Sequence, residues 1–316
     1  MRAKYRHALP QLGEGLFLTD GGLETTLIFH EGIELPHFAA FDLMRTAEGR
    51  AALGRYFARY VKLAKREGRG LVLESATWRA NPDWGRKLGY SPDALDEVNA
   101  EAVAFLQEIR AREETPASPM VVSGNVGPRG DGYRPEMLMD AEEAEAYHGR
   151  QVRAFEAAGA DLVTVMTMNY VEEAIGVARA AKAAGMPVVV GFTVETDGRL
   201  RTGMGLGAAI AACDAATGGY PAYYMVNCAH PSHFSGVLGG RWVERIGGIR
   251  ANASRMSHDE LDEAAELDAG DPEELAAAYR GLMRLLPGLR VVGGCCGTDH
   301  RHVGAISGAC SHVHAT

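Results

Sequence analysis

The sequence predicts an α/β fold, a (β/α)8 TIM barrel that occupies residues 1–316 as a single domain. Eight short apolar segments alternate with helix-like segments, at spacings of a few tens of residues. The apolar segments are continuous, which is typical of strands that are buried on both faces of a sheet. Polar residues gather where these segments end, and in this fold that end of the barrel carries the chemistry. A doubly wound open sheet is the second choice.

The predicted strands are apolar segments that end at glycines or polar residues. The first runs into Asp20-Gly21-Gly22, and nothing there resembles a dinucleotide-binding glycine motif. The seventh has the weakest signal. In chain order, the strands are expected at residues 16–22, 71–75, 120–124, 161–167, 188–192, 223–228, 246–250 and 289–294.

The helices between these strands are marked by capping residues. Gly68 stops the first long helix, Ser91 and Asp140 precede the next two, and Asp299 can cap the last one, which should fade before His312. The acidic stretch 256–271 is expected to be an exposed excursion with a solvated face. The other helices are expected at about 46–67, 92–112, 141–158, 171–184, 208–216 and 273–286.

Composition excludes several classes of function. The chain is 47% hydrophobic and 23% charged, enough for a sizeable core, and its net charge of -9 without a basic stripe argues against a nucleic-acid partner. No apolar run has the length of a membrane span, and the basic residues 1–7 lack the apolar region of a signal peptide. Five cysteines, an odd number, argue against a disulfide framework. A reducing cytoplasmic location is therefore expected.

A pair of adjacent cysteines ends the last predicted strand. Neighbouring side chains of a straight strand point to opposite faces, but the glycines around Cys295-Cys296 let the backbone turn so that both sulfurs can converge. Cys228 closes the sixth strand, which lies close to the eighth in such a barrel. Three thiols there would suit a soft metal ion, most plausibly zinc, and would leave a fourth position open, as in catalytic zinc sites.

Other interpretations of these residues stay open on spacing alone. Cys295 and Cys296 can be buried small apolar residues, or they can form a redox disulfide with each other. His230 can be a fourth ligand or the cap of the following helix. Histidines near the C-terminus look like metal ligands but are more often solvated; they are His300, His302, His312 and His314.

Four short motifs of the sequence resemble those of the homocysteine S-methyltransferase family, the zinc-dependent thiol methyltransferases. They run from the first to the eighth strand, so that the resemblance covers nearly the whole chain, and the last two are highly specific in combination. The motifs are Asp20-Gly21-Gly22, Ser123-Gly124-Asn125-Val126-Gly127-Pro128, Val226-Asn227-Cys228-Ala229-His230-Pro231 and Gly293-Gly294-Cys295-Cys296-Gly297-Thr298.

The resemblance implies a (β/α)8 barrel in which Cys228, Cys295 and Cys296 bind Zn²⁺. It also implies that residues 20–22 help to hold the thiol-bearing amino acid, although Asp20 could equally be a turn residue. Thr77 falls where the family has a threonine after the second strand. The expected substrate-binding residues are Asp20, Gly21, Gly22, Glu74, Thr77 and Asn227.

One departure from the family pattern concerns the acceptor. Many relatives end the fourth strand with a glutamate that holds the amino group of the substrate, and Met166 stands at that position here. A methionine cannot pair with an ammonium group. Either another carboxylate, Glu74 or Glu195, replaces the glutamate, or the acceptor is not homocysteine.

The expected reaction is the attack of a zinc-activated thiolate on the methyl group of a small onium donor. The chain length leaves no room for folate- or cobalamin-binding domains, which favours a donor such as S-methylmethionine or a betaine, with methionine as the product. Trp78 can face the cation of the donor, or it can simply pack at the barrel mouth.

Two alternatives to this function remain: transfer or demethylation with a different thiol and donor, and a non-catalytic zinc–thiolate barrel. The expected partners are a small-molecule thiol and a methyl donor, with no nucleic acid and no membrane. The sequence does not indicate an oligomeric state.

Overall fold

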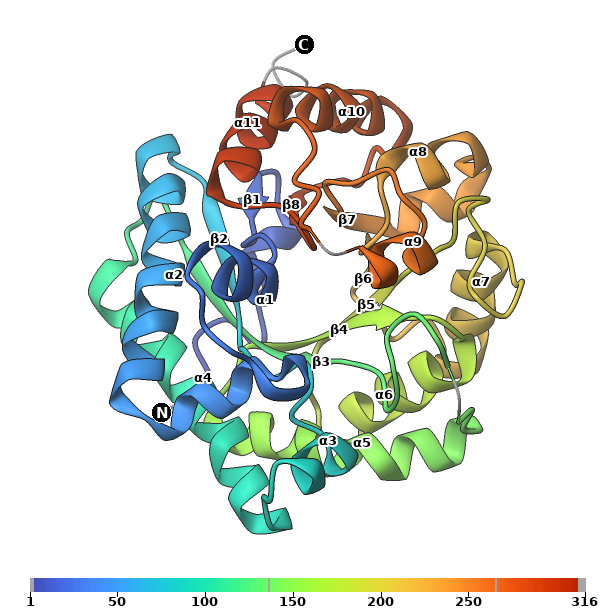
Figure 1. The fold of residues 1–316 in the computed structure, drawn as a ribbon. Helices are drawn as coiled ribbons and strands as arrows, with labels where there is room; N and C mark the ends of the chain where they lie inside the picture. The colour runs from blue at the N-terminus through green and yellow to red at the C-terminus, as the bar shows by residue number, and fades with distance from the viewer. Residues whose placement is uncertain (1–2, 136, 265, 312–316) are drawn as a thin grey trace.

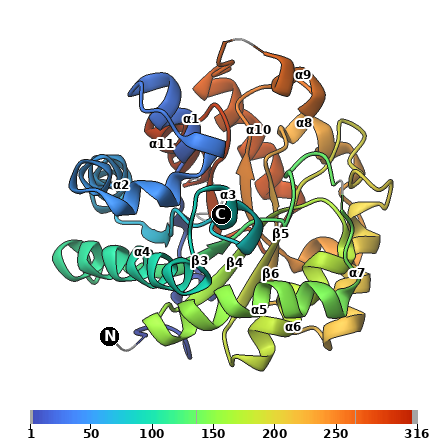
Figure 2. The ribbon, with the colours of Figure 1, turned by 60° about the horizontal axis from the view of Figure 1, so that its bottom comes forward.

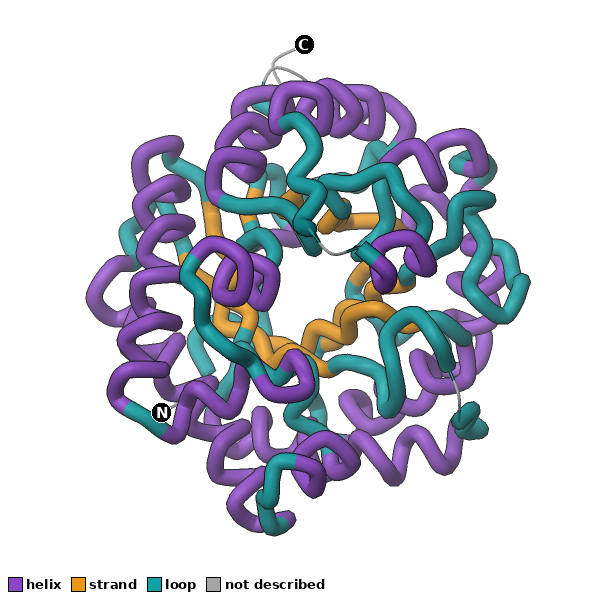
Figure 3. The backbone as a smooth tube through the Cα atoms, viewed as in Figure 1, coloured by secondary structure: helices purple, strands orange, loops and turns teal. Residues whose placement is uncertain are grey.

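The computed structural model describes residues 3–135, 137–264 and 266–311, and its centre is a closed barrel of parallel strands (Figures 1 and 3). Each strand pairs with the next one in the sequence, and β8 closes the barrel by pairing with β1. The strands are β1 (Phe17–Leu18), β2 (Gly70–Glu74), β3 (Met120–Val126), β4 (Leu162–Met168), β5 (Val188–Phe192), β6 (Tyr223–Asn227), β7 (Ile246–Ala251) and β8 (Val291–Gly294).

The long helices surround the barrel, and α4, α5 and α6 lie along one side of it in Figure 2. No helix in the described ranges combines the length and the apolar character that a membrane crossing needs. The α-helices are α1 (Leu23–Thr25), α2 (Ala47–Glu67), α3 (Pro82–Lys87), α4 (Pro92–Glu113), α5 (Ala141–Ala158), α6 (Val171–Ala183), α7 (Leu206–Thr217), α8 (Pro231–Phe234), α9 (His258–Glu263), α10 (Pro272–Leu285) and α11 (His300–Cys310). Short 3-10 segments occur at Pro10–Leu12, Pro36–Phe38, Ala40–Arg45, Ser235–Val237 and Arg241–Arg245, and a π-helical turn at Thr26–His30.

Capping places the helix ends where the sequence predicts them. The Thr46 hydroxyl accepts a hydrogen bond from the Gly49 amide at the start of α2, and Gly68 ends that helix in the left-handed conformation. The Asp140 carboxylate accepts hydrogen bonds from two amides of the first turn of α5, and Gly159 ends it in the same way. The (β/α)8 prediction is confirmed, with strand and helix bounds that differ by a few residues.

The apolar core has two layers because successive strand residues alternate between the inside of the barrel and the helices. Inside the barrel, Phe17, Val121, Tyr223 and Met225 belong to one buried cluster, which Leu9 joins from the N-terminal segment. A larger cluster fills the space between the strands and the helices. In this fold the active site lies above the carboxyl ends of the strands.

The stretch 256–271 differs from the expectation of an exposed excursion. Much of it is exposed, but α9 buries the imidazole of His258. His258 Nε2 lies 2.7 Å from the Cys228 carbonyl oxygen, and its ring stacks on Tyr133 at 4.0 Å between centroids. The composition of the segment did not predict this contact, because one buried histidine changes the average polarity of a mostly acidic segment very little.

Candidate metal centre and ligand pocket

Three cysteines meet at the carboxyl end of the barrel. Cys228 follows β6, whereas Cys295 and Cys296 follow β8, and their sulfur atoms all lie within 4.8 Å of one another. Cys228 has a φ of 53°, a left-handed conformation that is unfavourable for a residue other than glycine. Its carbonyl oxygen accepts hydrogen bonds from Asn252 Nδ2 at 3.0 Å and from Thr193 Oγ1 at 3.3 Å, which hold this conformation.

The structure joins two of these cysteines in a disulfide. The bond links Cys228 to Cys295, while Cys296 keeps a free, half-buried thiol. The adjacent pair Cys295-Cys296 is therefore not bonded to itself, and the chain has one disulfide and three free cysteines in the described residues. Backbone hydrogen bonds fix the turn after β8 that carries both cysteines. The Cys295 amide donates to the Ala251 carbonyl, and the Cys296 carbonyl accepts from the Ala253 amide. Only the reduced chain can offer all three sulfurs as thiolates.

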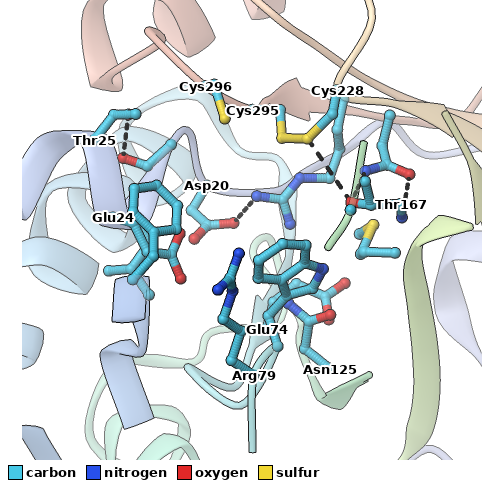
Figure 4. A pocket seen from close by; sticks show the side chains of 18 of the residues that line it. Asp20, Glu24, Thr25, Glu74, Arg79, Asn125, Thr167, Cys228, Cys295 and Cys296 are labelled. Carbon is cyan, nitrogen blue, oxygen red and sulfur yellow. Dashed lines mark hydrogen bonds and ion pairs between the residues drawn. A yellow bond between two sulfur atoms is a disulfide. The ribbon is translucent and has the colours of Figure 1, made fainter. Parts of the chain in front are cut away.

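A pocket of about 290 Å³ opens beside the cysteines (Figure 4). It lies where a TIM barrel carries its active site. The predicted site residues that line it are Asp20, Gly21, Gly22, Glu74, Trp78, Asn227, Cys228, Cys295 and Cys296. Met166, which takes the place of the family glutamate, also lines it.

Asp20 is already paired within the protein. Its carboxylate lies 2.6 Å from Arg250 Nη2 and accepts a hydrogen bond from the Tyr56 hydroxyl at 2.9 Å. Burial alone would lower the pKa of Arg250, but the carboxylates of Asp20 and Glu74 outweigh it and raise that pKa. Arg250 also donates to the carbonyls of Gly21 and Gly294, so that it ties β7 to the ends of β1 and β8. Sequence reasoning missed Arg250, although a charge in an otherwise apolar strand was the available signal.

Gly21 and Gly22 allow a close approach of two loops. A Cβ atom at Gly22 would lie 2.7 Å from the Cys295 carbonyl oxygen, too close for any side chain. The Gly22 amide donates to the Thr298 carbonyl at 3.0 Å. These glycines therefore place the segment after β1 directly against the cysteine turn.

Glu74 carries a carboxylate oxygen that no protein group satisfies. The side chain is buried at the end of β2, and its Oε2 has no hydrogen-bond partner in the protein. Burial raises the pKa of Glu74 to about 7, although the nearby charge of Arg250 opposes this shift. Glu195, the other candidate for replacing the family glutamate, does not line the pocket and instead pairs with His258 and Arg201.

Two predicted substrate residues have their polar groups occupied by the protein. The Thr77 hydroxyl donates to the Asn125 carbonyl at 2.7 Å, and Thr77 is not among the residues that line the pocket. Asn227 lines the pocket, but its amide accepts from the Thr167 amide and donates to the Thr167 hydroxyl, each at 2.9 Å. Thr167 has a φ of 63°, an outlier for a β-branched residue, and Asn227 holds it there.

The pocket also contains charged and aromatic side chains that sequence reasoning did not select. Glu24, Arg79 and Tyr133 all line it, and the Tyr133 hydroxyl lies 3.6 Å from Cys296 Sγ. The cation nearest Trp78 is the guanidinium of Arg79, whose Cζ lies 5.1 Å from the ring centroid. Glu24 lies in the short helix α1, and Arg79 and Tyr133 lie in loops, where no periodic pattern marks them out.

Two of the histidines considered as metal ligands, His230 and His302, cap helices instead. His230 caps α8 by accepting from the Ser232 amide at 3.2 Å, as one of the two interpretations expected. His302 completes the capping box at the start of α11, and His300 is exposed. His312 and His314 lie outside the described residues.

Comparisons with known proteins agree over nearly the whole chain. Residues 17–310 match the profile of a family described as "Homocysteine S-methyltransferase". The chain is 25% identical to "Homocysteine S-methyltransferase 4" of Zea mays over 93% of this chain and 89% of that protein.

Solved structures of the homocysteine methyltransferase MmuM from Escherichia coli share the fold. The oxidized form superposes with a TM-score of 0.74 at 21% identity, covering 95% of this chain and 98% of that one. The metallated form gives 0.69 at 22% identity, covering 96% and 98%. Taken together with the family match over residues 17–310, these findings establish that the chain belongs to the homocysteine S-methyltransferase family and is a methyltransferase.

Proposed function

We propose that this chain transfers a methyl group from a small onium donor to the thiol of homocysteine, and that a zinc ion bound by Cys228, Cys295 and Cys296 assists the transfer. The observation that carries the proposal is the convergence of three cysteine sulfurs within 4.8 Å, at the edge of a pocket that holds a buried, unpaired carboxylate oxygen. The family match supports the reaction, and the metallated form of the Escherichia coli protein supports a metal.

The donor set fits zinc once the disulfide is reduced. Reduction by a dithiol supplies two electrons and two protons and breaks the bond between Cys228 and Cys295. The three thiolates then match the soft-ligand preference of zinc and leave one position for the substrate sulfur. Zinc supplies one chemical effect when bound, which is to keep a thiol deprotonated and nucleophilic at neutral pH.

The protein side chains orient the acceptor. The free Oε2 of Glu74 accepts a hydrogen bond from the ammonium group of homocysteine, which replaces the function that Met166 cannot perform. Burial holds the pKa of Glu74 near 7, and the positive charge of the substrate favours the ionised carboxylate that this contact needs. The Met166 side chain leaves the β4 position of the pocket apolar.

The transfer itself needs alignment more than proton transfer. The sulfur of the acceptor forms a bond to the methyl carbon while the bond between that carbon and the onium sulfur or nitrogen breaks, and the electron pair leaves with the donor, which becomes neutral. No acid or base takes part in this displacement. The pocket walls contribute by fixing the approach of the two reactants.

Glu74→Gln should raise the KM for homocysteine roughly 10- to 100-fold, because a hydrogen bond to a charged group contributes about 1.5–3 kcal/mol. The measurement is the formation of methionine from homocysteine and S-methylmethionine by the reduced, zinc-loaded protein. Adding Met166→Glu to this variant returns a carboxylate to the pocket from β4, and the double variant should recover part of the lost affinity.

A matched control separates this effect from the general loss of a negative charge. Glu244 is exposed in the 3-10 segment that leads into β7, at the opposite end of the barrel, so Glu244→Gln should leave the KM for homocysteine unchanged. An unaltered KM in Glu74→Gln would refute the role of Glu74. No methionine from the wild-type protein would refute the proposed reaction.

A further inference from the structure

Two arginines line the pocket, and they differ in how well the protein satisfies them. Arg250 Nη2 pairs with Asp20 and donates to the Gly21 carbonyl, and its Nε donates to the Gly294 carbonyl. Arg79 donates to the His37 carbonyl at 2.9 Å, but its contact with Asp131 is long, at 3.4 Å, and its buried Nε has no partner in the protein. Arg79 is thus the pocket cation with the weaker contacts to protein anions, and it keeps capacity to bind an anion.

Aromatic rings hold this guanidinium in place. Its Cζ lies 4.0 Å from the ring centroid of Trp84 and 5.9 Å from that of Phe38, in addition to the contact with Trp78. Figure 4 shows the Arg79 side chain rising from the loop after β2 into the pocket. A planar guanidinium fixed against rings is preorganised for the two-point binding of a carboxylate.

Glu24 provides the opposite charge in the same pocket. It lies in α1, after the glycines that follow β1, and lines the cavity together with Arg79. In the described ranges, no ion pair within 4.0 Å joins Glu24 to Arg79. The carboxylate that pairs with Arg79 is that of Asp131. Each nevertheless lies close enough for its charge to influence the pKa of the other. The same pocket is therefore lined by a cation and an anion that do not form an ion pair with each other.

We propose that Arg79 and Glu24 form a zwitterion subsite that binds the amino-acid head of the methyl donor, with Arg79 on its carboxylate and Glu24 on its ammonium group. This inference rests on the proposed function, in which Glu74 serves the acceptor. It makes the two residues specificity determinants, because a betaine offers Arg79 a carboxylate but offers Glu24 no N–H donor. The enzyme should therefore prefer a sulfonium amino acid to glycine betaine.

The test compares Arg79→Gln and Glu24→Gln with Arg86→Gln, whose side chain in α3 is 75% exposed. Arg79→Gln and Glu24→Gln should each raise the KM for S-methylmethionine roughly 10- to 100-fold and leave the KM for homocysteine within about twofold. Glu24→Gln should also reduce the preference for S-methylmethionine over glycine betaine. Arg79→Lys keeps the charge without the planar fork and should lie between the wild type and Arg79→Gln. Arg86→Gln should behave as the wild type.

Binding of S-methylmethionine, measured by calorimetry without homocysteine, separates this inference from the proposed function. Weaker binding in Arg79→Gln and Glu24→Gln supports the subsite even if the wild-type protein forms no methionine, a result that would refute the proposed reaction alone. Wild-type affinity in both variants would overturn the subsite, as would no detectable binding to the wild type. A rise in the KM for homocysteine instead of the donor would overturn its assignment to the donor. Circular dichroism confirms that each variant is folded.

Discussion

Cys296→Ala is expected to lose its bound zinc and to lower the rate of methyl transfer by well over 100-fold, since removal of a partner outside the ligand shell already costs 10- to 100-fold in metal sites. Cys296 is the most informative of the three cysteines because it takes no part in the disulfide. Its loss therefore keeps both cysteines of the disulfide, so that the variant can be reduced in the same way as the wild type. Metal content by mass spectrometry and methionine formation measure the two effects on the same sample.

Cys213→Ala provides the matched control for that variant. Cys213 is a buried free cysteine in α7, and burial raises the pKa of its thiol to about 11. Its replacement removes one thiol from the chain but none from the pocket, so that zinc content and activity should both be retained. Full zinc content in Cys296→Ala would show that the metal is held elsewhere.

Arg250→Met is expected to lower the free energy of unfolding by about 3–5 kcal/mol, the usual cost of removing one partner of a buried ion pair. The substitution leaves Asp20 and Glu74 buried without the guanidinium that neutralises them. It also removes the hydrogen bonds from Arg250 to Gly21 and Gly294, which hold the ends of β1 and β8. Denaturation by urea measures the change.

Two further variants show whether the buried charge causes this loss. Adding Asp20→Asn to Arg250→Met removes the unpaired carboxylate and should recover part of the stability, as expected when both members of a buried pair are replaced. Arg86→Met breaks an exposed ion pair with Asp83 and should cost less than about 1 kcal/mol. Equal losses in Arg250→Met and Arg86→Met would contradict a structural role for the pair with Asp20.

The sequence predicted the barrel well because its signals are local and repeated. Continuous apolar segments mark strands buried on both faces, as in Val188–Phe192, and residues such as Ser91 and Asp140 mark where helices begin. The convergence of Cys228 with Cys295 and Cys296 followed from the strand order, since β6 and β8 both pair with β7.

The contacts inside the pocket could not be predicted in the same way. Whether Cys295 or Cys296 faces Cys228 depends on the turn after β8, and the amide of Asn227 is used by Thr167, a residue distant in sequence. Glu24 lies in a helix of three residues and Arg79 in a loop, and neither segment is long enough to give a periodic pattern. Only the folded structure shows that these two opposite charges line the same cavity.

The central claim is that three reduced cysteines form one zinc site, and the most direct measurement is the zinc content of the wild-type protein before and after reduction. Thiol titration of the unfolded protein verifies the two states, which should show three free thiols with the disulfide intact and five after its reduction. The reduced protein should bind about one zinc ion per chain and the oxidized protein none, because three thiolates complete a catalytic zinc site. A fully reduced protein that binds no zinc, or an oxidized protein that binds as much, would contradict the account.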